Sequence, residues 1–154
     1  DALFLRLLLE INQAGLSWLT ILKKKEGFKS AYPSIATVAE FTDEDFERLR
    51  QDSSIIRNKL KIKAAIYNAK AIQEMQKTHG SFELWLEHHH PLNKSEWVKL
   101  FKKHFKFTGG EITREFLVSL GYLPGAHHHS CRIYEQIKDA PWQLVNNDDI
   151  DWDL

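Results

Sequence analysis

Glu10 and Trp18 are the residues of this 154-residue chain whose types point most directly to chemistry. A carboxylate can accept hydrogen bonds from a polar ring edge or activate water as a general base. An aromatic face attracts cations. Eight positions separate the two residues, and Gly15 between them permits a tight turn after a helix end, so they can converge. Spacing alone leaves the alternative open that Trp18 is a core aromatic and Glu10 a solvated helix residue.

His127 and Cys131 form a second candidate group, because both residue types are good zinc ligands. A separation of four places them on one helix face or across one turn. The chain has a single cysteine, so a closed tetrahedral site cannot be built from this pair unless His128 or His129 contributes. The single cysteine also excludes an internal disulfide framework and favours a reducing compartment, which we expect to be the cytoplasm.

Basic side chains are concentrated in the middle of the chain. Residues 55–106 carry 11 basic and 4 acidic side chains, although the net charge of the whole chain is zero. We expect a turn at residues 53–59 to present backbone N–H groups at the start of a helix, which is a natural phosphate site. Arg57, Lys59 and Lys61 add positive charge there. The alternatives are an ordinary packing corner between two helices and solvated lysines.

Helical periodicity dominates the hydrophobic pattern, as in Leu3, Phe4, Leu7, Leu8 and Ile11. No convincing strand pattern occurs, so the sequence predicts an all-α single domain of about seven to nine helices. The clearest helices are expected at residues 3–11, 16–25, 43–51, 59–77, 81–85, 95–104 and 112–120, with Gly27 ending the second.

The chain divides into a predicted domain at residues 1–137 and an acidic tail at residues 138–154. No apolar run approaches the length of about 18 residues that a membrane helix needs, so no membrane partner is expected. The first residue is Asp1 and nothing resembles a signal peptide. We therefore expect the chain to be a fragment, or the ordered part of a longer protein.

Several stretches together resemble the bacterial 3-methyladenine DNA glycosylase I family. The likeness is co-linear from the first residue to about Tyr134. The most specific stretch reads LEINQAGLSW. The resemblance rests on residues 9–18 (LEINQAGLSW), 54–62 (SIIRNKLKI) and 105–109 (FKFTG), and on His127 and Cys131.

The resemblance implies a helix-hairpin-helix fold and a monofunctional enzyme of base excision repair that hydrolyses the glycosidic bond of 3-methyladenine in alkylated DNA. It places Glu10 and Trp18 in the base pocket, with Glu10 as the catalytic residue. Structural zinc would be held by His127 and Cys131 with two ligands from an N-terminal segment that this chain lacks, and no cofactor is needed for the chemistry. We also expect a DNA wedge at Gly15 and Leu16, because an apolar side chain on a tight turn can insert into a base stack. The DNA contacts are expected at Ile55, Ile56, Arg57, Asn58, Lys59 and Lys61.

Some roles stay open on the sequence alone. Glu10 either binds and polarises the flipped base or acts as a strict general base, and we favour the first because the leaving group is good. The chain has no Asp between Asp52 and Asp139, which fits this branch of the superfamily. Leu16 is a wedge or a core residue. Glu111 is a favourable charge at a helix start or a second pocket acid.

The expected partner is alkylated double-stranded DNA, bound by a monomer. The rival hypothesis is a catalytically silent DNA-binding module on the same fold. The two differ in turnover, because only the enzyme produces abasic sites.

Overall fold

The structure is a computed structural model that describes residues 1–137 and 139. In this part of the chain every regular element is a helix, which confirms the predicted fold class. The elements are α1 (Ala2–Gln13), α2 (Trp18–Lys23), α3 (Lys25–Ala31), α4 (Ile35–Ala39), α5 (Asp43–Gln51), α6 (Lys59–His79), α7 (Phe82–His89), α8 (Lys94–His104), α9 (Gly110–Ser119) and α10 (Tyr134–Ile137).

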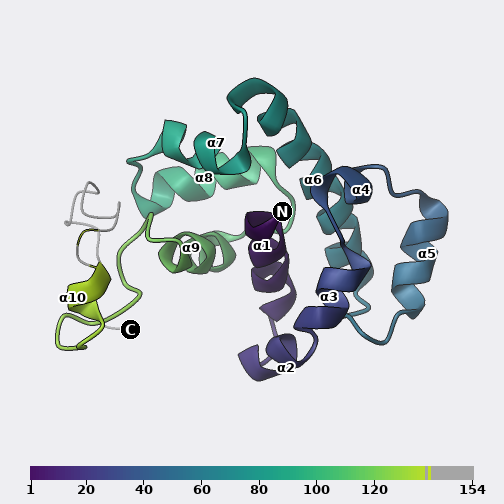
Figure 1. The fold of residues 1–154 in the computed structure, drawn as a ribbon, viewed down its shortest axis with the longest axis horizontal. Helices are drawn as coiled ribbons and strands as arrows, with labels where there is room; N and C mark the ends of the chain where they lie inside the picture. Colours follow the sequence, from purple (N-terminus) through teal and green to yellow (C-terminus); the bar gives the residue numbers. More distant parts are fainter. Residues whose placement is uncertain (138, 140–154) are drawn as a thin grey trace.

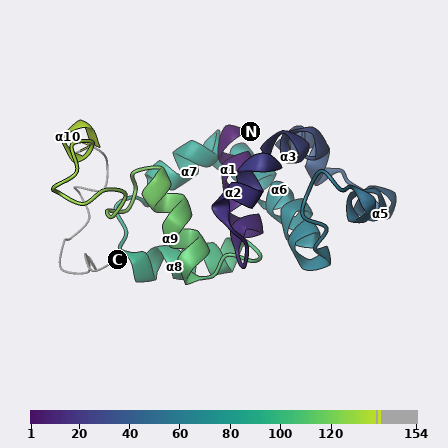
Figure 2. The same ribbon diagram turned by 90° about the horizontal axis from the view of Figure 1, so that it is seen from below.

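Helix α1 lies between two groups of helices. Figure 1 shows α3 to α6 on one side of it and α7 to α9 on the other, with α2 at its lower end. The view from below shows the same order, with α5 and α10 at opposite ends of an elongated molecule (Figure 2). Residues on α1 contact α2, α3, α6 and α9, so α1 joins the two halves.

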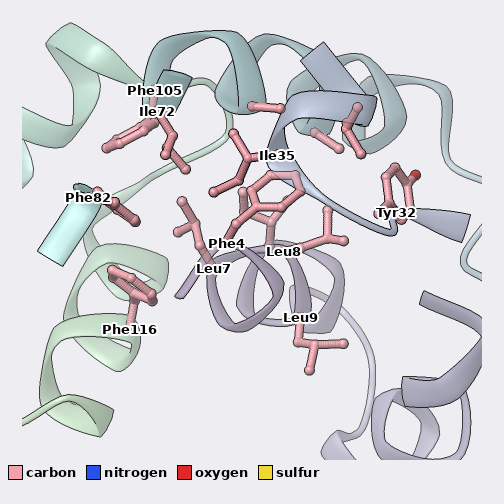
Figure 3. Packing of buried hydrophobic residues seen from close by; sticks show 14 of the residues in the cluster. Phe4, Leu7, Leu8, Leu9, Tyr32, Ile35, Ile72, Phe82, Phe105 and Phe116 are labelled. Atoms are coloured by element: carbon pink, nitrogen blue, oxygen red, sulfur yellow. The ribbon is translucent and has the colours of Figure 1, made fainter. Parts of the chain in front are cut away.

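The core forms around the apolar face of α1, as Figure 3 shows. Phe4, Leu7 and Leu8 are each at most 2% exposed, and their spacing of three and four positions places them on one side of the helix. Ile72 of α6 and Phe116 of α9 close the core from the two halves. Burying one such side chain contributes about 1.5–3 kcal/mol, so α1 is a central stabilising element and a firm base for Glu10.

Short polar side chains fix the starts of several helices. Ser17 accepts a hydrogen bond from the Thr20 amide at the start of α2, and Ser81 accepts one from the Leu84 amide at the start of α7. Asn93 caps α8 in the same way. The predicted helix at residues 43–51 is confirmed with the same bounds as α5, where the Thr42 amide donates to Asp45. The caps at Thr42 and Ser81 therefore explain why the starts of α5 and α7 could be predicted.

The prediction for residues 16–25 was wrong in one respect, because the structure has two helices there and not one. Helix α2 ends at Lys23, and α3 then includes Gly27 in its first turns. A Cβ atom on Gly27 would lie 2.3 Å from the carbonyl oxygen of Ser54. Gly27 is therefore required for close packing of α3 on the turn before α6, and it does not end a helix. With the short helices α4 and α10, the described residues hold ten helices, slightly more than expected.

Two further predictions concern the ends of the domain. Within residues 1–137 and 139, no helix is both long and apolar enough to cross a membrane. The predicted acidic tail at residues 138–154 lies outside the described residues, apart from Asp139.

Candidate functional site

Glu10 is a buried carboxylate near the C-terminal end of α1, with only 6% of its surface exposed. Its Oε1 atom lies 2.9 Å from Nη2 of Arg6, one helical turn earlier. Burial is the main influence on its pKa and raises it; the Arg6 guanidinium lowers it, and the Glu115 carboxylate on α9 raises it. The arrangement therefore holds an acid at the α1–α9 interface whose ionisation depends on neighbouring charge.

Trp18 is the first residue of α2, and a turn brings it close to Arg6. Gly15 in this turn has a φ of 82°, a conformation that favours glycine. The guanidinium carbon of Arg6 lies 5.2 Å from the centre of the Trp18 ring. Arg6 thus contacts both Glu10 and Trp18 and links the two residues across the turn. Arg6 and Trp18 also line a hollow of about 250 Å³, together with Ala2, Leu5, Leu9, Leu22 and Lys25.

The turn between α1 and α2 is closed by its own hydrogen bonds. The Leu16 amide donates to the Gln13 carbonyl at 2.7 Å, and the Gln13 side chain donates to the Leu16 carbonyl at 3.1 Å. The Leu16 side chain is 37% exposed. It is therefore not a core residue, and the turn presents it to solvent beside Gly15.

Lys61 reaches this turn from α6. Its ammonium group donates to the Asn12 carbonyl at 3.0 Å and to the Ala14 carbonyl at 2.7 Å. These carbonyls belong to the end of α1, where helical acceptors lack partners within the helix. Lys61 is 6% exposed, and burial lowers its pKa. The expected DNA contact at Lys61 is thus corrected, because its side chain is committed to the protein interior.

The turn between α5 and α6, residues 52–58, is the expected DNA-contacting segment. Arg57, Asn58 and Lys59 are exposed and Ile56 is half-buried, whereas Ile55 is 2% exposed and belongs to the core. The Ile55 side chain therefore packs in the core, which leaves only the backbone of this residue for the predicted DNA contact.

Asn58 occupies backbone N–H groups at the start of α6 that were expected to bind phosphate. Its side-chain oxygen accepts from the amides of Leu60 and Lys61, at 3.0 and 3.1 Å. Two of the N–H groups that were expected to face phosphate are therefore bound within the protein, because an Asn in this position caps its own helix.

Glu111 does not belong to the pocket. It lies in the first turn of α9, where its side chain is 78% exposed and its Oε1 atom lies 3.5 Å from Nζ of Lys94. Arg6 and Glu115 are the pocket charges that sequence reasoning missed. Arg6 has a signal in the sequence, since it precedes Glu10 by four positions on a predicted helix. Glu115 has none, because only the packing of α9 on α1 brings it close.

His127 and Cys131 lie side by side in the segment before α10. Cys131 Sγ is 3.6 Å from His127 Nδ1. Two ligands of one tetrahedral zinc ion are about 3.6 Å apart, given typical zinc–ligand bond lengths. The pair fits half of a zinc site. His128 uses its Nδ1 atom in a contact of 2.7 Å with Ser130 Oγ. Among the described residues there is no group of three or more His, Cys, Asp or Glu that could hold a metal ion.

The sequence of this chain is similar to those of known proteins. Residues 1–98 match the family described as methyladenine glycosylase. The chain is 33% identical to DNA-3-methyladenine glycosylase 1 of Escherichia coli strain K12, over 86% of this chain and 81% of that protein. It is also 33% identical to DNA-3-methyladenine glycosylase of Haemophilus influenzae, over 84% of this chain and 80% of that protein.

Solved structures show the same likeness in three dimensions. A structure of 3-methyladenine DNA glycosylase I from Staphylococcus aureus, described as the structural basis of 3-methyladenine recognition, has a TM-score of 0.74 and 30% identity. The alignment covers 85% of this chain and 80% of that one. A tyrosine-to-phenylalanine variant of 3-methyladenine DNA glycosylase I in complex with 3-methyladenine also has a TM-score of 0.74 and 30% identity, over 85% of this chain and 81% of that one. On the sequence match and the shared fold, this chain belongs to the methyladenine glycosylase family.

Proposed function

We propose that this chain is a monofunctional DNA-3-methyladenine glycosylase, which hydrolyses the N-glycosidic bond of 3-methyladenine in alkylated DNA. Membership in the family supports this function. The observation that carries it is the convergence of a buried carboxylate, Glu10, with an aromatic face, Trp18, around a turn that presents an exposed leucine.

The chemistry of the lesion explains why these groups suffice. Methylation at N3 makes the purine positively charged, so its bond to the sugar is already weak. Trp18 would stack on the flipped cationic base, and the Glu10 carboxylate would accept hydrogen bonds from its edge. As the bond between the base and C1′ breaks, its electron pair passes to the purine. Water then adds to C1′ and loses a proton, leaving free base and an abasic site.

Glu10 would bind and stabilise the leaving base more than it activates water. Its carboxylate pairs with Arg6 and is almost fully buried. A charge in such a site of low dielectric is suited to electrostatic stabilisation of the leaving base. The good leaving group makes only a small demand on base catalysis.

Double-stranded DNA would be gripped by the last residues of the 52–58 turn and the first residue of α6, namely the half-buried Ile56 and the exposed Arg57, Asn58 and Lys59. Flipping the nucleotide costs a few kcal/mol of stacking and pairing. Leu16, on the tight turn at Gly15, would fill the gap that the flipped base leaves. This grip needs one protein molecule on the DNA, so we propose that a monomer is the active form.

The decisive experiment measures release of free 3-methyladenine from methylated duplex DNA by chromatography. We expect release by the wild-type chain and a loss of at least about 100-fold on Glu10→Gln, because electrostatic groups of this kind typically contribute that much. DNA affinity should change little. The matched control is Glu111→Gln, an exposed glutamate outside the pocket, which should leave release intact. Duplex binding without any release would favour the silent DNA-binding module.

A second experiment tests the wedge. Leu16→Ala should slow excision from fully paired duplex more than excision from a site opposite a mismatch, where less stacking is lost on flipping. Leu84→Ala is the matched control, because Leu84 is another exposed leucine, 50% exposed, on α7. Equal effects of Leu16→Ala on both substrates would contradict the wedge.

We further propose that His127 and Cys131 are two of the four ligands of a structural zinc site in the full-length protein. The 3.6 Å spacing of Sγ and Nδ1 supports this. Zinc would order the segment before α10 and take no part in the hydrolysis. Metal analysis of the full-length protein should find about one zinc per chain, and Cys131→Ser should abolish it without abolishing excision.

A further inference from the structure

Arg6 occupies the position that a cationic base needs. Its Nη2 atom lies 2.9 Å from Glu10 Oε1, and its guanidinium carbon lies 5.2 Å from the centre of the Trp18 ring. Its Nε group donates to Ser119 Oγ at 3.1 Å. A guanidinium is a planar, delocalised cation that stacks on aromatic rings and binds carboxylates. An N3-methylated purine in DNA has the same three properties, so the two compete for the same partners.

We propose that Arg6 is an internal competitor for the alkylated base, which must leave Glu10 and Trp18 before the base can bind. This inference rests on the proposed function, because that function assigns the base to these two residues. In the unliganded chain the Arg6 guanidinium satisfies the Glu10 carboxylate and covers the Trp18 face. The incoming alkylated base, which is a cation while it is still part of the DNA, then replaces the Arg6 guanidinium at Glu10 and Trp18.

The exposure of the partners shows which side chain can move. The Arg6 side chain is 36% exposed, whereas that of Glu10 is 7% exposed. Its third partner, Ser119, is also exposed. Release of Arg6 would leave the buried Glu10 carboxylate unpaired, and the incoming base offsets this cost because it supplies a new partner for Glu10. Glu10 and Trp18 stay in place, because one is packed in α1 and the other begins α2 behind the Ser17 cap.

Competition has a definite consequence for affinity. The apparent affinity of a ligand falls by the fraction of molecules whose site is free. Removing Arg6 should therefore strengthen base binding, even though it removes a residue that touches the pocket. A residue that merely helps to hold the base, or one that only stabilises α1, would give the opposite sign or no change.

The test uses Arg6→Met, which keeps an unbranched side chain without the cation. Binding of free 3-methyladenine, the neutral product of the proposed reaction, is measured by calorimetry, because the product needs the same place beside Glu10 and Trp18 that Arg6 fills. We expect the affinity of the variant to rise by about twofold or more, the rise for a site that Arg6 fills in at least half of the molecules. The control is Arg50→Met, because Arg50 forms a similar group on α5. Its Nη1 atom lies 2.8 Å from Glu47 Oε2, and its guanidinium carbon lies 6.0 Å from the Phe46 ring centre. This control should bind as the wild type does.

Weaker or unchanged binding by folded Arg6→Met would overturn the inference and leave the proposed function standing. Arg6→Gln repeats the test with a polar side chain if Arg6→Met fails to fold. A second readout is the NMR signal of the Arg6 Nε–H group in the wild type, which should shift when 3-methyladenine binds. An unchanged signal in a saturated complex would overturn the inference. Absence of both base binding and base release in every variant would instead overturn the proposed function, and the inference with it.

Discussion

The buried carboxylate of Glu10 opposes folding and serves the site. Burial disfavours the ionised form, and the attraction of Arg6 offsets this only in part, so the pKa of Glu10 is raised on folding. An ionised Glu10 is nevertheless what a cationic ligand would attract. Residues that reduce stability in this way are expected at functional sites.

The pH dependence of stability follows from this shift. A carboxyl whose pKa is raised in the folded state stabilises the fold fully below its usual value of 4.5, and this contribution is lost as the pH rises through the folded value. Glu10→Gln should therefore melt at a higher temperature than the wild type near pH 7, and the difference should shrink as the pH falls through the raised pKa of Glu10 toward 4.5. Thermal melts of both proteins across this range check the prediction. A difference independent of pH would contradict it, and Glu111→Gln serves as the control.

At the scale of elements, the α1–α2 turn depends on the helix that follows the 52–58 turn. Lys61 in the first turn of α6 binds two carbonyls at the end of α1. Gly27 lets α3 approach the Ser54 backbone, and Lys24 donates to the Ser53 carbonyl at 2.6 Å. The proposed DNA grip and the proposed base pocket are thus joined by direct contacts, so movement of one would displace the other.

Lys61→Met should destabilise the protein by about 1–3 kcal/mol, because the carbonyls of Asn12 and Ala14 would lose their buried donor. Urea denaturation gives the free energy of unfolding. Lys70→Met replaces an exposed lysine on the same helix and should change stability by less than about 0.5 kcal/mol. Similar effects of the two substitutions would rule out the bridging role of Lys61.

Gly27→Ala should destabilise the protein by about 1–3 kcal/mol, because its Cβ would overlap the Ser54 carbonyl and force α3 and the 52–58 turn apart. The control is Gly110→Ala at the start of α9, where no atom lies within 4 Å of the added Cβ. That substitution should be neutral or slightly stabilising, since alanine favours helix. Chemical denaturation of the two variants decides the matter, and a neutral Gly27→Ala would contradict the close approach.

At the scale of the whole molecule, affinity for a polyanion must come from an uneven distribution of charge. The formal net charge is zero, yet residues 55–106 carry 11 basic against 4 acidic side chains. Arg57 and Lys59 lie in the exposed part of this region, next to the 52–58 turn. A basic face on a neutral protein can attract DNA locally while the remaining surface does not.

The salt dependence of duplex binding measures this local contact. Arg57→Ala and Lys59→Ala should each reduce the slope of log K against log salt concentration by about 1, because each removes one phosphate contact. Lys77→Ala should leave the slope unchanged, since Lys77 lies at the other end of α6 and pairs with Glu74 at 2.6 Å. Equal slopes for all three variants would mean that the DNA lies elsewhere.

Much of the architecture followed from local patterns. The apolar spacing along α1 and the caps at Thr42 and Ser81 predicted the helical class and most of the helices. The motif at residues 9–18 predicted the turn that separates Glu10 on α1 from Trp18. These features depend on residues within one or two turns of each other, where periodicity and capping act directly. The exposed Leu16 was left open, because exposure depends on what packs beside a turn.

The tertiary structure decided what depends on distant segments. Lys61 is of a residue type that often contacts DNA. It is a buried donor only because α6 approaches the end of α1. Gly27 resembles a helix end, and only the Ser54 backbone shows that it is a packing contact. Two further groups are occupied in the same way. The Asn58 side chain accepts from the Leu60 amide, which was expected to face phosphate, and Arg6 pairs with the Glu10 carboxylate, which was expected to bind the base. A sequence shows which groups a chain possesses, but burial and long-range packing determine which of them already have partners within the protein.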